Sequence, residues 1–95
     1  TKKGSIYVGV CIDTASTLGM CAERNAVANM ITNGESGLRR VLAINSKGKA
    51  LPPCGACREL MTQLMPQDYR GVEVMLDYEK ERIVTLGELT PEWWL

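Results

Sequence analysis

The sequence predicts an α/β fold in which a mixed sheet is joined by crossover helices, within a single domain over residues 1–95. Segments with the short apolar pattern of strands alternate with segments of helical spacing, which favours parallel strands. Only residues 77–81 separate the last two expected strands, whereas a parallel connection needs about a dozen residues. The last strand is therefore expected to run antiparallel.

Four strands are expected. Residues 6–12 (IYVGVCI) form a mostly apolar, β-branched run, which indicates a strand buried on both faces. Shorter apolar runs predict strands at residues 41–44, 72–76 and 82–84. The turn at residues 46–48 closes the second of these strands.

Two helices and a final helical turn are expected between and after these strands. From Cys21 to about Ile31 the spacing places Val27, Met30 and Ile31 on the inner face, and Asn33-Gly34 supplies a left-handed stop. A second helix is expected over residues 54–65. The segment TLGE at residues 85–88 has the form of a capping box, so a final turn should begin there.

The composition excludes several classes of partner. At 45% hydrophobic residues the chain can form a core, and its eleven basic residues balance eleven acidic ones with no run of Lys or Arg longer than two. Such a chain has no patch suited to a polyanion, so nucleic acid is not an expected partner. No apolar stretch has the length of a signal peptide or a membrane helix. We therefore expect no membrane partner and a cytoplasmic location.

The cysteines are the chemically informative residues. Four cysteines without an export signal are more typical of metal ligands or redox groups than of disulfides. Because the sequence has no histidine, a transition-metal site must use thiolates and carboxylates. Cys54 and Cys57 open one expected helix and Cys21 opens the other, where helix N-termini favour thiolates. Glu23 shares the inner face of its helix, so its carboxylate needs a partner or a function.

Two short motifs carry a resemblance to a known family. Cys21-Ala22-Glu23 and, further along, Pro53-Cys54-Gly55-Ala56-Cys57 resemble the signature of the zinc-dependent cytidine deaminase superfamily, (His or Cys)-x-Glu…Pro-Cys-x-x-Cys. With Arg24 and Arg58 directly after the two motifs, the chain is most similar to the free-nucleoside branch, cytidine deaminase and blasticidin-S deaminase. The resemblance runs from about Gly4 to the C-terminus.

The resemblance implies a fold, a cofactor and an activity. The fold would be the three-layer α/β/α cytidine deaminase-like arrangement, assembled as a homotetramer. One zinc ion per chain would be held by Cys21, Cys54 and Cys57, with Arg24 donating to a thiolate sulfur. Glu23 would move protons during hydrolytic deamination of a free cytosine nucleoside or analogue, such as cytidine, deoxycytidine or blasticidin S, with release of ammonia.

The resemblance also assigns residues to substrate binding. The backbone N–H of Ala22 would bind the base, and Pro53 would also be a substrate-binding residue. Cys11 and Asp13 stand where free cytidine deaminases have an Asn-x-Glu segment that binds the ribose, and this departure favours blasticidin S or a modified nucleoside. At the other end, Trp94, with Trp93 beside it, would stack on the base in a neighbouring subunit or pack in the subunit interface.

A second departure concerns the start of the chain. The family has a helix and a strand before the position of Thr1, and that strand lies between the strands expected here at residues 6–12 and 41–44. The sequence does not contain them, so we expect the domain to be incomplete at its N-terminal side.

Alternatives remain open at this point. A thioredoxin-like redox pair would oxidise Cys54 and Cys57 reversibly and bind no zinc. A closed structural zinc site would add Cys11 as a fourth ligand and give an interaction module without turnover. Cys11 is also explained as a small apolar residue in a strand, and Arg24 and Arg58 as solvated helix charges.

Overall fold

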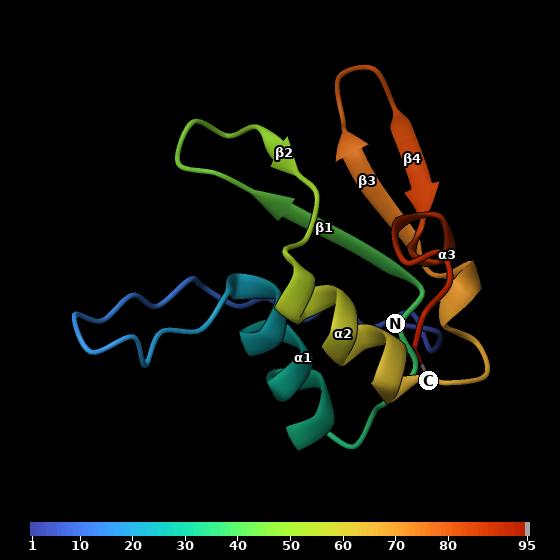
Figure 1. The fold of residues 1–95 in the computed structure, drawn as a ribbon, viewed down its shortest axis with the longest axis horizontal. Coiled ribbons are helices and arrows are strands. Elements are labelled where there is room, and N and C mark those ends of the chain that lie inside the picture. Colours follow the sequence, from blue (N-terminus) through green and yellow to red (C-terminus); the bar gives the residue numbers. More distant parts are fainter. Residues whose placement is uncertain (95) are drawn as a thin grey trace.

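The computed structural model describes residues 1–94 of the chain (Figure 1). In chain order the elements are α1 (Ala22–Thr32), β1 (Arg40–Ile44), β2 (Ala50–Leu51), α2 (Gly55–Leu64), the 3-10 helix η1 (Tyr69–Gly71), β3 (Glu73–Asp77), β4 (Arg82–Thr85) and α3 (Leu86–Leu89). No helix in the described part of the chain is long and apolar enough to cross a membrane.

The strands form one mixed sheet in the order β2-β1-β3-β4. β1 and β3 are parallel and are connected through α2, as the strand-helix-strand pattern predicts. β4 runs antiparallel to β3, which confirms the prediction made from the short connection between them. The two-residue strand β2 was not predicted, because two residues are too few to show a period; it pairs with β1 across the predicted turn.

One face of the sheet packs against the helices. Val41, Val74 and Val84 pair in register, and Val74 is 1% exposed. The buried apolar side chains come from all three α-helices, the sheet and the segments between them: Val27, Met30, Leu38, Cys57, Met61, Met65, Tyr69, Val72, Val74 and Leu86. On the opposite face Leu42, Ile44 and Ile83 are exposed, so within residues 1–94 the helices cover one face of the sheet.

The predicted helix boundaries agree with the structure to within one residue. Cys21 and Cys54 are the N-cap residues of α1 and α2. Gly34 ends α1 with a φ of 86°, in the left-handed conformation expected of it. The capping box between Thr85 and Glu88 is present with both of its hydrogen bonds.

The prediction of a buried strand at residues 6–12 is wrong for the described structure. The segment is extended, but its one bridge joins Ile12 to Met20, and Ile6 is 90% and Val8 77% exposed. A strand is buried on both faces only inside a sheet, and no other strand among residues 1–94 lies alongside this one. Ile31, expected on the inner face of α1, is likewise exposed.

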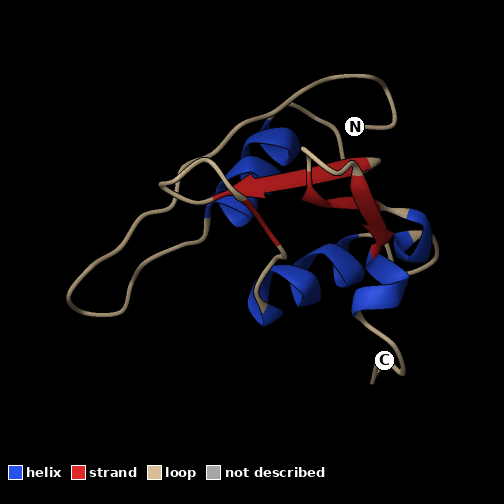
Figure 2. Ribbon diagram, turned by 90° about the horizontal axis from the view of Figure 1, so that it is seen from above, coloured by secondary structure: helices blue, strands red, loops and turns tan. Residues whose placement is uncertain are grey.

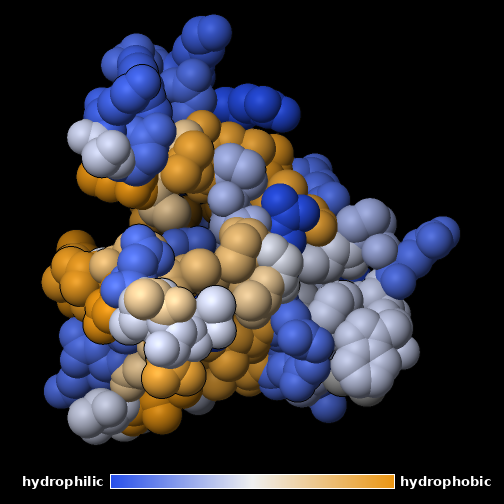
Figure 3. Space-filling view, turned by 60° about the vertical axis from the view of Figure 1, so that its left-hand side comes forward, coloured by the Kyte–Doolittle hydropathy of each residue, from blue (hydrophilic) through white to orange (hydrophobic). Residues whose placement is uncertain are grey.

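Residues 10–20 form a loop that extends away from the helices and strands in both ribbon views (Figures 1 and 2). The face that carries this loop shows separate apolar patches, drawn in orange (Figure 3). Val10, Leu18 and Met20 are exposed apolar residues of the loop.

Two groups of contacts hold the extended segment against the body of the protein. Thr1 Oγ1 and Tyr7 Oη donate to the two carboxylate oxygens of Glu35, at 2.6 and 2.5 Å. These hydrogen bonds, chiefly that from Thr1, lower the pKa of Glu35 to about 2. Further along, Gly9 lies so close to α1 that a Cβ atom there would be 2.4 Å from the backbone nitrogen of Ala26.

We predict that Gly9→Ala lowers the free energy of unfolding by about 1–3 kcal/mol, because the methyl group would force the segment away from α1. Urea denaturation measures the change. Gly71→Ala is the matched control: a Cβ there meets nothing within 4 Å, and alanine restricts the unfolded chain. Equal stability of Gly9→Ala and the parent would contradict the close contact.

Candidate metal centre and the adjoining hollow

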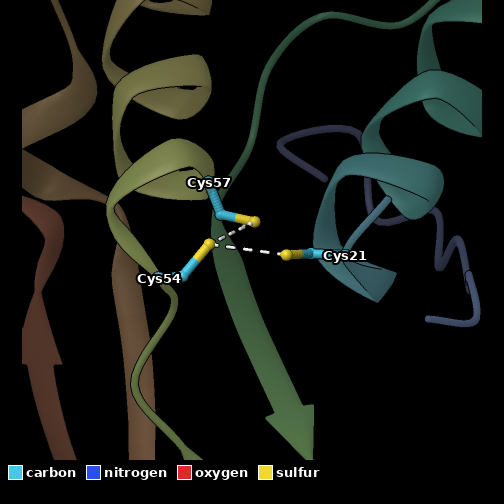
Figure 4. Close-up of side chains that lie close together, drawn as sticks. All are labelled: Cys21, Cys54 and Cys57. Carbon is cyan, nitrogen blue, oxygen red and sulfur yellow. Dashed lines mark hydrogen bonds between the residues drawn. The ribbon is translucent and has the colours of Figure 1, made fainter. Parts of the chain in front are cut away.

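Three cysteine side chains from two helix N-termini meet at one point (Figure 4). Cys21 reaches it from the start of α1, and Cys54 and Cys57 from the start of α2 on the opposite side. The Cys54 sulfur lies 3.4 Å from that of Cys21 and 3.5 Å from that of Cys57. All three sulfurs lie within 4.8 Å of one another, and none forms a disulfide.

These three thiols fit a tetrahedral metal. Zn–S bonds of about 2.3 Å at tetrahedral angles place neighbouring sulfurs about 3.8 Å apart. The observed separations of 3.4 and 3.5 Å are close to this spacing. Cys11 is not part of the group; its sulfur lies 3.7 Å from Asp13 Oδ1. The residues present therefore suit an open three-thiolate site rather than a closed site of four cysteines, and a third sulfur beside Cys54 and Cys57 is not expected of a simple redox pair.

The thiols differ in their electrostatic surroundings. The backbone N–H of Cys57 points towards the Cys54 sulfur and is the main cause of a lowered pKa at Cys54, although neither N-cap cysteine makes a formal capping hydrogen bond. Burial is the main cause of a raised pKa at Cys57, whose side chain is fully buried. The exposed Cys54 thiol therefore ionises more easily than the buried Cys57 thiol.

Arg24 lies beside the sulfurs. Its pKa is raised, first by a contact with the Cys21 sulfur and then by the charges of Cys21 and Cys57. Its buried Nε has no hydrogen-bond partner in the described structure. A half-buried cationic group next to three thiols is stabilised when those thiols are thiolates, which is their state as metal ligands.

Glu23 occupies the first turn of α1 and is half-buried. Burial is the main cause of the raised pKa of both Cys57 and Cys11, and the negative charge of Glu23 adds a smaller contribution to each. The carboxylate is thus near enough to both cysteines to interact with their charges. Such a position suits a group that moves protons between a metal centre and a bound molecule.

A hollow of about 360 Å³ adjoins the sulfur group. Eight residues line it: Cys11, Asp13, Thr14, Thr17, Gly19, Met20, Cys21 and Arg24. The structure therefore brings the two sequence-predicted sugar-binding residues, Cys11 and Asp13, to the same hollow as a metal ligand.

Other sequence-predicted residues are placed differently. Ala22 is the first residue of α1, and Pro53, which is buried, directly precedes α2's N-cap. Trp93 and Trp94 pack against each other with ring centroids 5.9 Å apart, and Trp94 is 69% exposed. Neither tryptophan lines the hollow.

Sequence reasoning missed several residues around the hollow. Thr14, Thr17 and Met20 belong to a loop without a periodic pattern, so no signal pointed to them. Gly19 is required because a Cβ there would lie 2.4 Å from the backbone oxygen of Ile12. Asn25 donates from Nδ2 to the Val10 carbonyl at 2.6 Å and so holds the hollow's wall against α1.

The mixed sheet and the three-thiol group define an α/β protein with a group of cysteines, at two helix N-termini, that could hold a metal ion. No protein-family model matches the chain. The chain is 34% identical over 91 residues to cytidine deaminase of Halalkalibacterium halodurans, which covers 95% of this chain and 68% of the relative. It is 27% identical over 100 residues to blasticidin-S deaminase of Bacillus cereus, covering 96% and 69%.

Solved structures agree with the sequence comparison. The crystal structure of cytidine deaminase from Mycobacterium leprae superposes with a TM-score of 0.82 at 27% identity, over 96% of this chain and 72% of that one. The chain belongs to the cytidine deaminase family. It spans between 42% and 69% of the length of the curated relatives it matches.

We predict that the protein binds one zinc ion per chain and that Cys21→Ser, Cys54→Ser and Cys57→Ser each lose most of it on dialysis, because each removes one of three converging ligands. Cys11→Ser, whose sulfur lies outside the group, should keep the parent's zinc content. Elemental analysis of the dialysed proteins gives the number of zinc ions per chain. Loss of zinc from Cys11→Ser would indicate a four-cysteine site instead.

Proposed function

We propose that the protein is a zinc-dependent hydrolase that deaminates a free cytosine nucleoside or analogue to its uracil form and releases ammonia. The observation that carries this proposal is the convergence of three thiols from two helix N-termini beside a hollow. Glu23 follows the ligand Cys21 by two residues, in the first turn of α1. Membership of the cytidine deaminase family supports it.

Cys21, Cys54 and Cys57 would hold the zinc ion. Bound there with a fourth position open, zinc would acidify a water molecule and so supply the nucleophile. Three thiolates leave a divalent ion with a formal charge of minus one, which opposes this acidification. Arg24 and the N-termini of α1 and α2 place positive charge beside the sulfurs and offset part of the excess.

Glu23 would carry the protons of the reaction. The water oxygen bonds to the ring carbon that bears the amine, while Glu23 takes a proton from the water and delivers it to the ring nitrogen. The bond from that carbon to the amine nitrogen then breaks. Glu23 passes the second water proton to the amine, which leaves as ammonia, and the carbon keeps the oxygen as a carbonyl.

The hollow supports a nucleoside-sized substrate without a phosphate group. Arg24 is the cationic residue among its lining, and its charge faces the sulfurs, so a phosphate would find the carboxylate of Asp13 and no free cation. Asp13, Thr14 and Thr17 offer hydrogen bonds to sugar hydroxyls. The backbone N–H of Ala22 would bind the base. Cytidine, deoxycytidine and blasticidin S are the substrates to test.

Assembly and location form part of the same proposal. A homotetramer would allow Trp94, with Trp93 beside it, to reach the site of a neighbouring subunit, and the exposure of Trp94 supports such a contact. The cytoplasm, where thiols remain reduced, suits three metal-binding cysteines.

We predict that ammonia release from one of these three substrates falls about 10²–10⁴-fold in Glu23→Gln, because the variant removes general acid-base catalysis but leaves the thiol ligands in place. Ammonia release is measured with an enzyme-coupled assay on proteins of equal zinc content. Glu59→Gln, which alters an exposed carboxylate on α2, is the matched control. Turnover by Glu23→Gln at the parent's rate would remove Glu23 from the mechanism.

A further inference from the structure

The side chain of Arg58 connects two backbone carbonyls from separate elements. Its Nε donates to the Pro53 oxygen at 2.7 Å, and its Nη1 donates to the Leu89 oxygen at 3.1 Å; both contacts are partly buried. Pro53 directly precedes the thiol ligand Cys54, and Leu89 is the last residue of α3. Arg58 therefore touches both the start of α2 and the end of α3.

The first contact restrains the peptide between Pro53 and Cys54. The proline ring fixes φ and is buried, and the hydrogen bond from Arg58 fixes the direction of its carbonyl. Cys54 needs such support, because it is the exposed member of the thiol group while Cys57 is fully buried. Its sulfur also lies between the other two, at 3.4 and 3.5 Å, so a shift of Cys54 would disturb both neighbours.

The second contact ties this support to the C-terminal part of the chain. The last carbonyls of a helix have no partner within it, and Arg58 binds that of Leu89. A guanidinium presents several N–H groups in a rigid fork, so it can donate to two carbonyls at once, whereas a lysine ammonium is a single point charge on a flexible stem.

α1 has an equivalent arrangement. Asn25 and Arg58 each stand four residues after an N-cap cysteine, and their backbone N–H groups bond to the carbonyls of Cys21 and Cys54. The Asn25 side chain then binds the carbonyl of Val10 on the neighbouring segment. Both thiol-bearing helices thus use the same position to hold an adjacent stretch of backbone.

We propose that Arg58 is a positioning residue that fixes the metal ligand Cys54 through Pro53 and couples it to α3 through Leu89. The inference rests on the proposed metal site and not on the identity of the substrate. Arg58 acts on the affinity and geometry of the site through the backbone rather than by touching the metal or the substrate.

The test measures metal binding in the full-length protein and needs no substrate. Zinc affinity is determined by competition with a chromophoric chelator, and the absorption spectrum of the cobalt-substituted protein reports the geometry of the thiolate ligands. We expect Arg58→Gln to bind zinc about 10–100-fold more weakly and to shift the cobalt spectrum. Arg58→Lys keeps the positive charge but lacks the planar guanidinium, so its zinc affinity should lie between those of Arg58→Gln and the parent. Arg82→Gln, an exposed arginine on β4, should match the parent.

The outcomes distinguish a failure of the Arg58 inference from a failure of the proposed metal site. A merely structural Arg58 would lower the unfolding midpoint of Arg58→Gln but leave the cobalt spectrum and zinc affinity as in the parent, and that result would overturn the inference. If Arg58→Gln does not fold, Arg58→Lys decides, since a parent-like spectrum and affinity there would show that the fork is not needed. A parent protein that binds neither metal would overturn the metal site itself.

Discussion

The packing of α1 beside α2 on one face of the sheet is the constraint on which the site depends. Val27 and Met30 of α1 and Met61 of α2 belong to one buried cluster, so the two helices cannot move apart without exposing core side chains. Because each helix begins at a cysteine, this packing brings three sulfurs from distant parts of the chain within 4.8 Å of one another. The site is a consequence of how the core is formed.

The same arrangement sets the electrostatics of the site. Burial raises the pKa of Cys57, so holding three thiolates together requires compensating positive charge. Arg24 and the helix N-termini contribute to it. A divalent cation held by the thiols would add to it, and its binding would release the thiol protons. The hollow lined by Cys11 and Asp13 adjoins this charged group through Cys21 and Arg24, which also line it.

The features that depend on local sequence patterns were predicted from the sequence. The helix starts at Cys21 and Cys54, the antiparallel β4 and the capping box at Thr85 all follow from spacing and short motifs, and the structure confirms them. Residues 6–12 have the composition of a buried strand, but pairing depends on a neighbouring strand that composition does not report. The loop residues around the hollow and the contacts of Arg58 arise from tertiary packing, which leaves no period in the sequence.

The most direct test of a zinc site with an open position is X-ray absorption spectroscopy at the zinc K edge. The structure predicts three sulfur ligands at about 2.3 Å and one nitrogen or oxygen ligand at about 2.0–2.2 Å, since Cys21, Cys54 and Cys57 converge and Cys11 lies outside the group. A shell of four sulfurs would identify a closed structural site and contradict the account.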